Sequence, residues 1–124
     1  MSDLSDPYWG NVISVLNMLG SNGSNIFQDS KSNIVWTNNN NLTISNSLGY
    51  NVASFLGSEY LTRAYTSDFN WWVTAFTIEA WIRADSFSSW GTYSNMIGNM
   101  NPDNSIRYWS FGPTPSNKLR FMVS

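Results

Sequence analysis

The clearest pattern in the chain is the alternation of apolar and polar residues between Phe76 and Arg83. Positions 76, 78, 80 and 82 are apolar, and the positions between them are polar or amphipathic. Because successive side chains of a β-strand point to opposite faces, this period of two predicts a strand. We expect it to be the central strand of a β-sandwich, with Phe76, Ile78, Ala80 and Ile82 in the core between the sheets.

Shorter apolar runs on both sides of this segment predict further strands, and turn residues separate them. Residues 12–19 form a nearly continuous apolar run that periodicity alone allows as a buried strand or a helical turn, and the β-branched Val12, Ile13 and Val15 favour the strand. Other short strands are expected at 26–28, 34–36, 42–44, 52–55, 59–61, 93–99, 105–112 and 118–123. About nine short strands with no convincing helix predict an all-β protein, an antiparallel sandwich or a barrel.

The chain organisation suggests one domain behind a short arm. Residues 1–10 are a polar arm that ends in Pro7-Tyr8-Trp9-Gly10, and 11–124 have room for one hydrophobic core. The chain stops one residue after the apolar strand expected at Lys118–Val123. We therefore expect that strand to be a protected edge, or an open edge that another chain completes.

Composition excludes several classes of function. The chain has no Cys and no His, which rules out disulfides, Cys/His zinc sites and His-based catalytic triads. The net charge is −2 and the six Lys and Arg residues are scattered, so we expect no nucleic-acid partner. The start resembles no secretory signal and no apolar run approaches about 20 residues, so we expect cytoplasmic synthesis and no membrane insertion. Only 11% of residues are charged while 16% are aromatic, which suits contact surfaces.

Several blocks, in order along nearly the whole chain, resemble the concanavalin A-like lectin/glucanase superfamily, which includes laminin-G-like domains. The family's Ala-x-Phe-Asp-Gly and Asp-Tyr-Leu blocks are similar to 53–57 and 59–61, and its Phe-Thr-Ile-Glu-x-Trp-Val block is similar to 76–82. Further matches are Phe27-Gln28-Asp29-Ser30, Ile97-Gly98, Trp109-Ser110-Phe111-Gly112 and Leu119-Arg120-Phe121. The resemblance implies a jelly roll of two antiparallel sheets.

Two departures from the family pattern affect what the resemblance implies. Leu56 stands where the family has the Asp of Phe-Asp-Gly, which removes a polar anchor from that bend. The family domain also continues past the Leu-x-Phe strand, so the sandwich is expected to be incomplete and completed by a partner chain. The opening Asp6-Pro7-Tyr8-Trp9 is similar to domains on bacteriophage structural proteins. This implies a virion protein, a capsid decoration or tail-associated component, that contacts other virion proteins or its own copies through the edge at Lys118–Val123.

Catalysis and metal binding have weak support in the sequence. Glucanases of the superfamily use two carboxylates about 5–5.5 Å apart, but Glu79 has Thr77 and Trp81 at the same-face positions of its strand. We therefore expect no enzymatic activity, with glucanase as the less favoured alternative. The loop with Asn101, Asp103 and Asn104 offers oxygens of the kind that calcium prefers, but a plain Asn-Pro-Asp-Asn turn explains it better. No cofactor is expected, with Ca²⁺ as the alternative.

The candidate ligand-binding residues are aromatic, because flat rings in loops can stack on sugars or meet another protein. Packing beneath the loops is the simpler interpretation for any one of them. For Trp81, a ligand-facing position and packing under a neighbouring loop or subunit are equally supported. The set comprises Trp71, Trp72, Trp81, Trp90 and Tyr93. We expect a non-enzymatic virion structural or adhesion protein that makes protein contacts and contacts with surface glycans. The alternative is a free carbohydrate-binding module.

Overall fold

The computed structural model describes residues 6–69, 75–85, 95–100, 107–114, 116 and 118–123. The chain divides into two compact units, Met1–Asp68 and Phe69–Ser124. All paired strands are antiparallel, and the described residues contain no α-helix, only the short 3-10 helices η1 (Trp9–Asn11) and η2 (Ser67–Phe69). The prediction of an all-β protein built from antiparallel strands is therefore confirmed.

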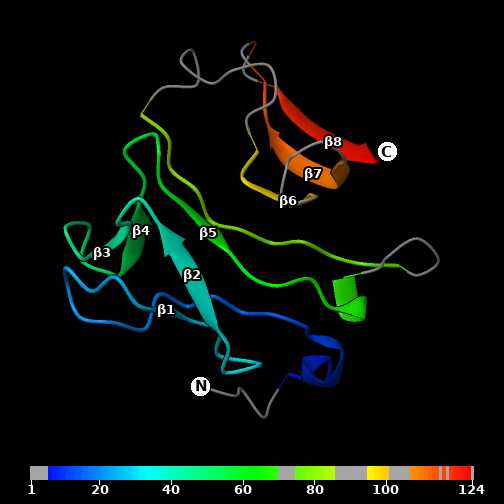
Figure 1. Ribbon diagram of the computed structural model, residues 1–124, viewed down its shortest axis with the longest axis horizontal. Coiled ribbons are helices and arrows are strands. Elements are labelled where there is room, and N and C mark those ends of the chain that lie inside the picture. Colours follow the sequence, from blue (N-terminus) through cyan, green and yellow to red (C-terminus); the bar gives the residue numbers. More distant parts are fainter. Residues whose placement is uncertain are drawn as a thin grey trace. The chain divides into compact units, whose positions relative to one another are not determined.

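The first unit contains two small sheets (Figure 1). One has the strand order β1–β2–β5, and the other pairs β3 with β4. These strands are β1 (Phe27–Gln28), β2 (Val35–Asn39), β3 (Thr43–Ser45), β4 (Val52–Ser54) and β5 (Tyr60–Thr62). Each overlaps a predicted strand, and β2 continues three residues beyond the strand predicted at 34–36. Since β4 and β5 pair in different sheets, the turn between them is a sheet bend and not a hairpin.

The core of the first unit is small and formed by residues from three places in the chain. Phe27, Leu42 and Ile44 are almost completely buried. Half-buried hydrophobic residues that pack against them are Met18, Trp36, Ala53 and Leu61. Burying each of the three central side chains contributes roughly 1.5–3 kcal/mol, so this cluster is the main apolar support of the two sheets.

Asparagine residues shape the turn between β2 and β3. Asn40 and Asn41 have φ values of 61° and 58°, in the left-handed region that Asn tolerates better than most residues. The side chain of Asn38 closes this turn, because its amide group donates to the carbonyl of Leu42 and its oxygen accepts from the amide of Leu42. The same amide also donates to the carbonyl of Asn25. The Asn run is thus a defined turn that positions Leu42 in the core.

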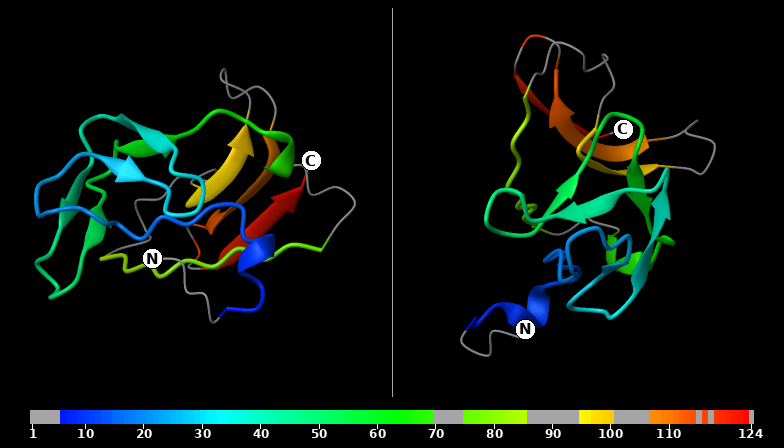
Figure 2. Two further views of the ribbon diagram at one scale, coloured as in Figure 1. Left: turned by 90° about the horizontal axis from the view of Figure 1, so that it is seen from below. Right: turned by 90° about the vertical axis from the view of Figure 1, so that its left-hand side faces the viewer.

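The second unit contains a three-stranded meander, β6–β7–β8 (Figure 2). Its strands are β6 (Ile97–Met100), β7 (Arg107–Pro113) and β8 (Leu119–Val123), which confirms the strands predicted at 93–99, 105–112 and 118–123. Gly98 allows β6 to approach β7 closely, since a Cβ there would lie 3.0 Å from the carbonyl oxygen of Trp109. Among the described residues β8 pairs only with β7, so its outer edge is open there.

The prediction of a central strand at Phe76–Arg83 is wrong. Residues 75–84 carry no strand hydrogen bonding, and Figure 1 shows them as a long open trace. Phe76, Ala80 and Ile82 are exposed, and only Ile78 is half-buried. The alternation expresses a preference for a strand, but a strand also needs a neighbour for its N–H and C=O groups, and no described residue provides one.

The strand predicted over residues 12–19 is also wrong. This segment is irregular and largely half-buried, and Met18 has a φ of 53°, which interrupts extended geometry. The backbone of Val15 is already bonded elsewhere, since its carbonyl accepts from the amide of Ser30 and its N–H donates to Asp29. The apolar run therefore lines the first unit as an ordered loop.

Candidate functional site

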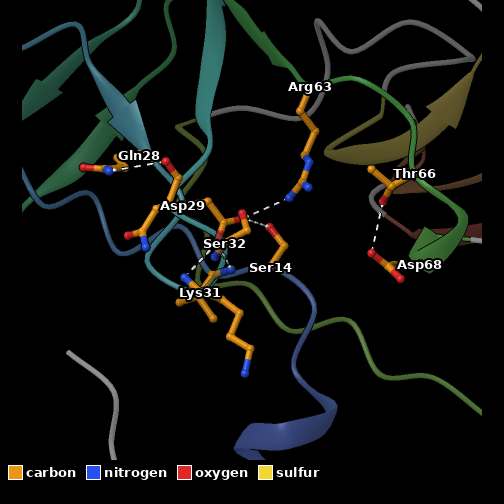
Figure 3. A network of polar contacts seen from close by, with 10 residues as sticks. Ser14, Gln28, Asp29, Lys31, Ser32, Arg63, Thr66 and Asp68 are labelled. Atoms are coloured by element: carbon orange, nitrogen blue, oxygen red, sulfur yellow. Dashed lines mark hydrogen bonds and ion pairs between the residues drawn. The ribbon is translucent and has the colours of Figure 1, made fainter.

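The most highly connected polar group in the described residues is the carboxylate of Asp29, which follows β1 and is fully buried (Figure 3). Its Oδ1 accepts hydrogen bonds from the backbone amides of Lys31 at 2.8 Å and Ser32 at 2.9 Å, and a longer one from Val15 at 3.3 Å. Its Oδ2 accepts from the hydroxyl of Ser14 and from Nη1 of Arg63, 3.1 Å away. The carboxylate thus joins the 12–19 segment, the turn after β1 and the chain beyond β5.

The hydrogen bonds decide the charge state of this group. Burial alone would raise the pKa of Asp29, but the bonds from Ser14, Ser32, Lys31 and Val15 together outweigh burial and lower that pKa below its ordinary value. Five donors saturate the roughly four acceptor positions of a carboxylate. Asp29 therefore has no room to bind a metal or to transfer a proton, and its role is to hold the fold.

Two cationic side chains beside Asp29 lie against tryptophan rings. The Nζ atom of Lys31 lies 4.7 Å from the centre of the Trp9 ring and donates to the Trp9 carbonyl at 2.7 Å. The guanidinium of Arg63 lies 5.7 Å from the ring centre of Trp36. Both distances are within the range of cation–π attraction. Trp9 is therefore anchored to the first unit, although it belongs to the segment predicted as an arm.

The second polar cluster is the turn between β4 and β5. The carboxylate of Glu59 accepts hydrogen bonds from the backbone amides of Leu56, Gly57 and Ser58, at 2.8–3.1 Å. Hydrogen bonds from its own amide and from those of the turn lower the pKa of Glu59. Glu59 is therefore the polar anchor of this turn. Leu56, which is 87% exposed, is held at the tip.

The second unit buries Trp109 but exposes several large apolar side chains along β8. Along β8 the residues that face outward are Leu119, Phe121 and Val123, at 65%, 45% and 57% exposure. The ring of Phe121 lies 5.7 Å from that of Phe76, so residues of the 75–85 segment reach the β8 strand. We call Phe76, Leu119, Phe121 and Val123 the β8 apolar set. Exposed apolar groups that gather in this way mark interaction sites in many proteins.

Of the predicted ligand-binding residues, the structure places one. Trp81 is completely exposed, with a relative accessibility of 103%. The others, Trp71, Trp72, Trp90 and Tyr93, lie outside the described residues, as do the calcium candidates Asn101, Asp103 and Asn104. Within the described ranges, no group of three acidic side chains is arranged to hold a metal ion.

Comparison of the chain with protein-family models, with curated proteins and with solved structures found no match. In the parts of the chain that the structure describes, no helix has the length and apolar character needed to span a membrane.

The two structural carboxylates, Asp29 and Glu59, are not among the residues predicted from the sequence to be functional. Phe27-Gln28-Asp29-Ser30 was singled out only for its resemblance to a family block. A local signal was present, because an acid followed by Ser30-Lys31-Ser32 is a common start of a turn in which the carboxylate accepts the next amides. The contributions of Ser14 and Arg63, 15 and 34 residues away in sequence, required the folded chain.

Proposed function

We propose that this protein is a non-enzymatic structural or adhesion component of a virion that acts by binding protein partners through its second unit. The observation that carries the proposal is the exposed β8 apolar set beside an edge of β8 that has no strand partner among the described residues. An open edge offers N–H and C=O groups to another strand, and the apolar side chains would leave water in such a contact. In this proposal the strands form a jelly-roll sandwich that a partner completes.

The described carboxylates support a role without catalysis. Asp29 and Glu59 are held by hydrogen bonds within the chain. Glu79 is exposed and makes no hydrogen bond or ion pair with another described residue. Acid/base catalysis by carboxylates requires two positioned groups, so a binding role fits these side chains better.

The placement on a bacteriophage particle rests on the resemblance of Asp6-Pro7-Tyr8-Trp9 to phage structural domains. The structure gives this opening a local role, because the amide of Tyr8 donates to Asp6 and Trp9 contacts Lys31. We propose that the protein decorates a capsid or belongs to a tail. Mass spectrometry of purified particles tests this location, and particles without the protein would contradict it.

Light scattering after size exclusion tests the interaction proposal. We expect the purified chain to elute with a mass above its monomer mass of 14.0 kDa. The double variant Leu119→Ser/Val123→Ser should lower that mass, because it removes apolar area from β8. Leu56→Ser is the control, since Leu56 is even more exposed, at 87%, but lies in the other unit. A monodisperse monomer, or equal effects of both variants, would refute the proposal.

The exposure of Trp81 favours a second candidate, a carbohydrate-binding module. A fully exposed indole can stack on the apolar face of a sugar ring, as aromatic residues do in many binding sites. A glycan array with the wild-type chain and Trp81→Ala tests this function. We expect binding that the substitution abolishes, and the absence of binding to every sugar would contradict it.

A further inference from the structure

The 77–85 segment has the properties of a strand without a neighbour. None of its backbone groups bonds to another residue in the described part of the chain. Just before it, Phe76 packs against Phe121 of β8, which ties the start of the segment to the second unit. Unpaired extended backbone of this kind is a template for pairing with a strand of another molecule.

The side chains of this segment are available to a partner. Trp81 is fully exposed, and Glu79, Ile82 and Arg83 are also exposed. The one polar contact of the segment is weak, since Nη2 of Arg83 lies 3.9 Å from Oδ1 of Asp85 and both side chains face solvent. Arg83 can exchange this contact for a better one at little cost.

Two copies of the segment are complementary in an antiparallel register centred on Trp81. Each Glu79 then faces Arg83 of the other copy, and each Thr77 faces Asp85. The symmetry produces the Glu79–Arg83 pair twice. Opposite charges placed directly across an antiparallel pair are stabilising, and so are facing aromatic rings such as the two Trp81 side chains.

Neighbouring registers lose this complementarity. A register centred on Glu79 places the two Glu79 side chains opposite each other. A register centred on Ile82 places Glu79 opposite Asp85. Centring on Ala80 sets Glu79 opposite Trp81 and leaves no charge pair. If the two-fold axis passed between two residues, apolar side chains of one copy would lie opposite polar side chains of the other, because a shift of one residue exchanges the two faces of a strand.

We propose that the 77–85 segments of two copies pair as antiparallel strands about a two-fold axis at Trp81. This inference rests on the proposed function and names its partner as a second copy of this chain. A two-fold interface uses the same patch on both copies, which a self-complementary segment requires. The pairing supplies the strand neighbour that the segment lacks within the described chain.

Cysteine cross-linking of the full chain tests the register. The natural sequence has no Cys, so Thr77→Cys and Asp85→Cys each introduce a single thiol. In the proposed register the two positions face each other at a Cα separation of about 4.5–5.5 Å, within the range that a disulfide spans. In either variant alone the two thiols would be roughly 27 Å apart, at about 3.4 Å per residue. A disulfide dimer is therefore expected only when the variants are mixed.

Charge reversal tests the pairing without removing the segment. Glu79→Arg or Arg83→Glu should raise the dissociation constant of the dimer by a factor of roughly five or more. Each substitution places two pairs of like charges directly opposite each other. The double variant E79R/R83E restores opposite charges and should return the affinity to the wild-type range. Sedimentation equilibrium at low ionic strength measures these changes, and the double variant also shows that the single variants fold.

The outcomes separate this inference from the proposed function. Two results would overturn the pairing but leave the β8 interaction intact. In the first, the Glu79→Arg variant associates as strongly as the wild-type chain. In the second, the mixture of cysteine variants cross-links no better than either variant alone. Association that is lost only in the Leu119→Ser/Val123→Ser variant would also overturn the pairing and support the β8 interaction. A wild-type chain that is monomeric overturns both.

Discussion

Replacing Asp29 by Asn tests the interpretation of the buried carboxylate as the organiser of the first unit. The amide side chain has the same size and keeps one acceptor oxygen, which can serve the backbone amides that now bond to Oδ1. The NH₂ group then takes the place of Oδ2. The Ser14 hydroxyl can rotate to accept from it, but the guanidinium of Arg63 has only donors and loses this partner.

The expected loss is large because both charges are buried. The side chains of Arg63 and Asp29 are 7% and 0% exposed, so the variant removes the counter-charge from a cation that has little access to water. Breaking a buried pair in this way costs about 3–5 kcal/mol, a substantial share of the roughly 5–15 kcal/mol that stabilises a typical domain. Arg63→Met in the Asp29→Asn background should recover part of the loss, because it removes the cation that has lost the Asp29 counter-charge.

Urea unfolding followed by tryptophan fluorescence measures the effect. Because the folded-state pKa of Asp29 is lowered, its contribution is present above the unfolded value of about 3.9 and is lost as the pH falls through the folded value. The difference between wild type and Asp29→Asn should therefore be full at pH 7 and shrink below about pH 3.9. Asp85→Asn is the control, since its ion pair is exposed and worth about 0–1 kcal/mol. A loss below about 1 kcal/mol at pH 7, or no pH dependence, would refute the reasoning.

Three further predictions concern local geometry. Glu59→Ala should speed amide exchange at positions 56–58, because the carboxylate that accepts their N–H groups is gone, and unchanged exchange by NMR would show that it does not hold the turn. Asn38→Ala should lower unfolding stability by about 1–3 kcal/mol, since it leaves the backbone polar groups of buried Leu42 without side-chain partners, and a loss no larger than that of Asn39→Ala would argue against this role. Gly20→Ala places a Cβ 2.6 Å from Cδ1 of core residue Ile44 and should cost about 1–3 kcal/mol in thermal unfolding, whereas Gly10→Ala meets nothing within 4 Å; equal melting temperatures would contradict the packing described for Gly20.

Local patterns predicted the paired strands well. Short β-branched and aromatic runs bounded by Asn, Gly and Ser correspond to β1 to β5, and the strands predicted at 93–99, 105–112 and 118–123 correspond to β6, β7 and β8. These elements were predictable because strand preference and turn preference act over a few residues. The choice of partners was not, and β4 and β5 joined different sheets although they are neighbours in sequence.

The same distinction explains the candidate sites. The aromatic contact residues stay a prediction, and the structure adds only that Trp81 is fully exposed. The roles of Asp29 and Glu59 were missed because a carboxylate looks the same in sequence whether it accepts hydrogen bonds from its own fold or faces a ligand. Only the distances to Ser14, Arg63 and the turn amides decided that both are structural.

The alternation at Phe76–Arg83 shows most directly what each level determines. The sequence by itself determined that this segment has two chemically different faces, because a period of two is a property of covalent order. It also predicted that the chain consists mainly of short strands separated by turns. Only the tertiary structure decided that this segment has no ladder among the described residues, while weaker patterns at 107–113 and 119–123 have one. The physical reason is that strand hydrogen bonds are made between segments, so a strand exists only where another backbone lies beside it.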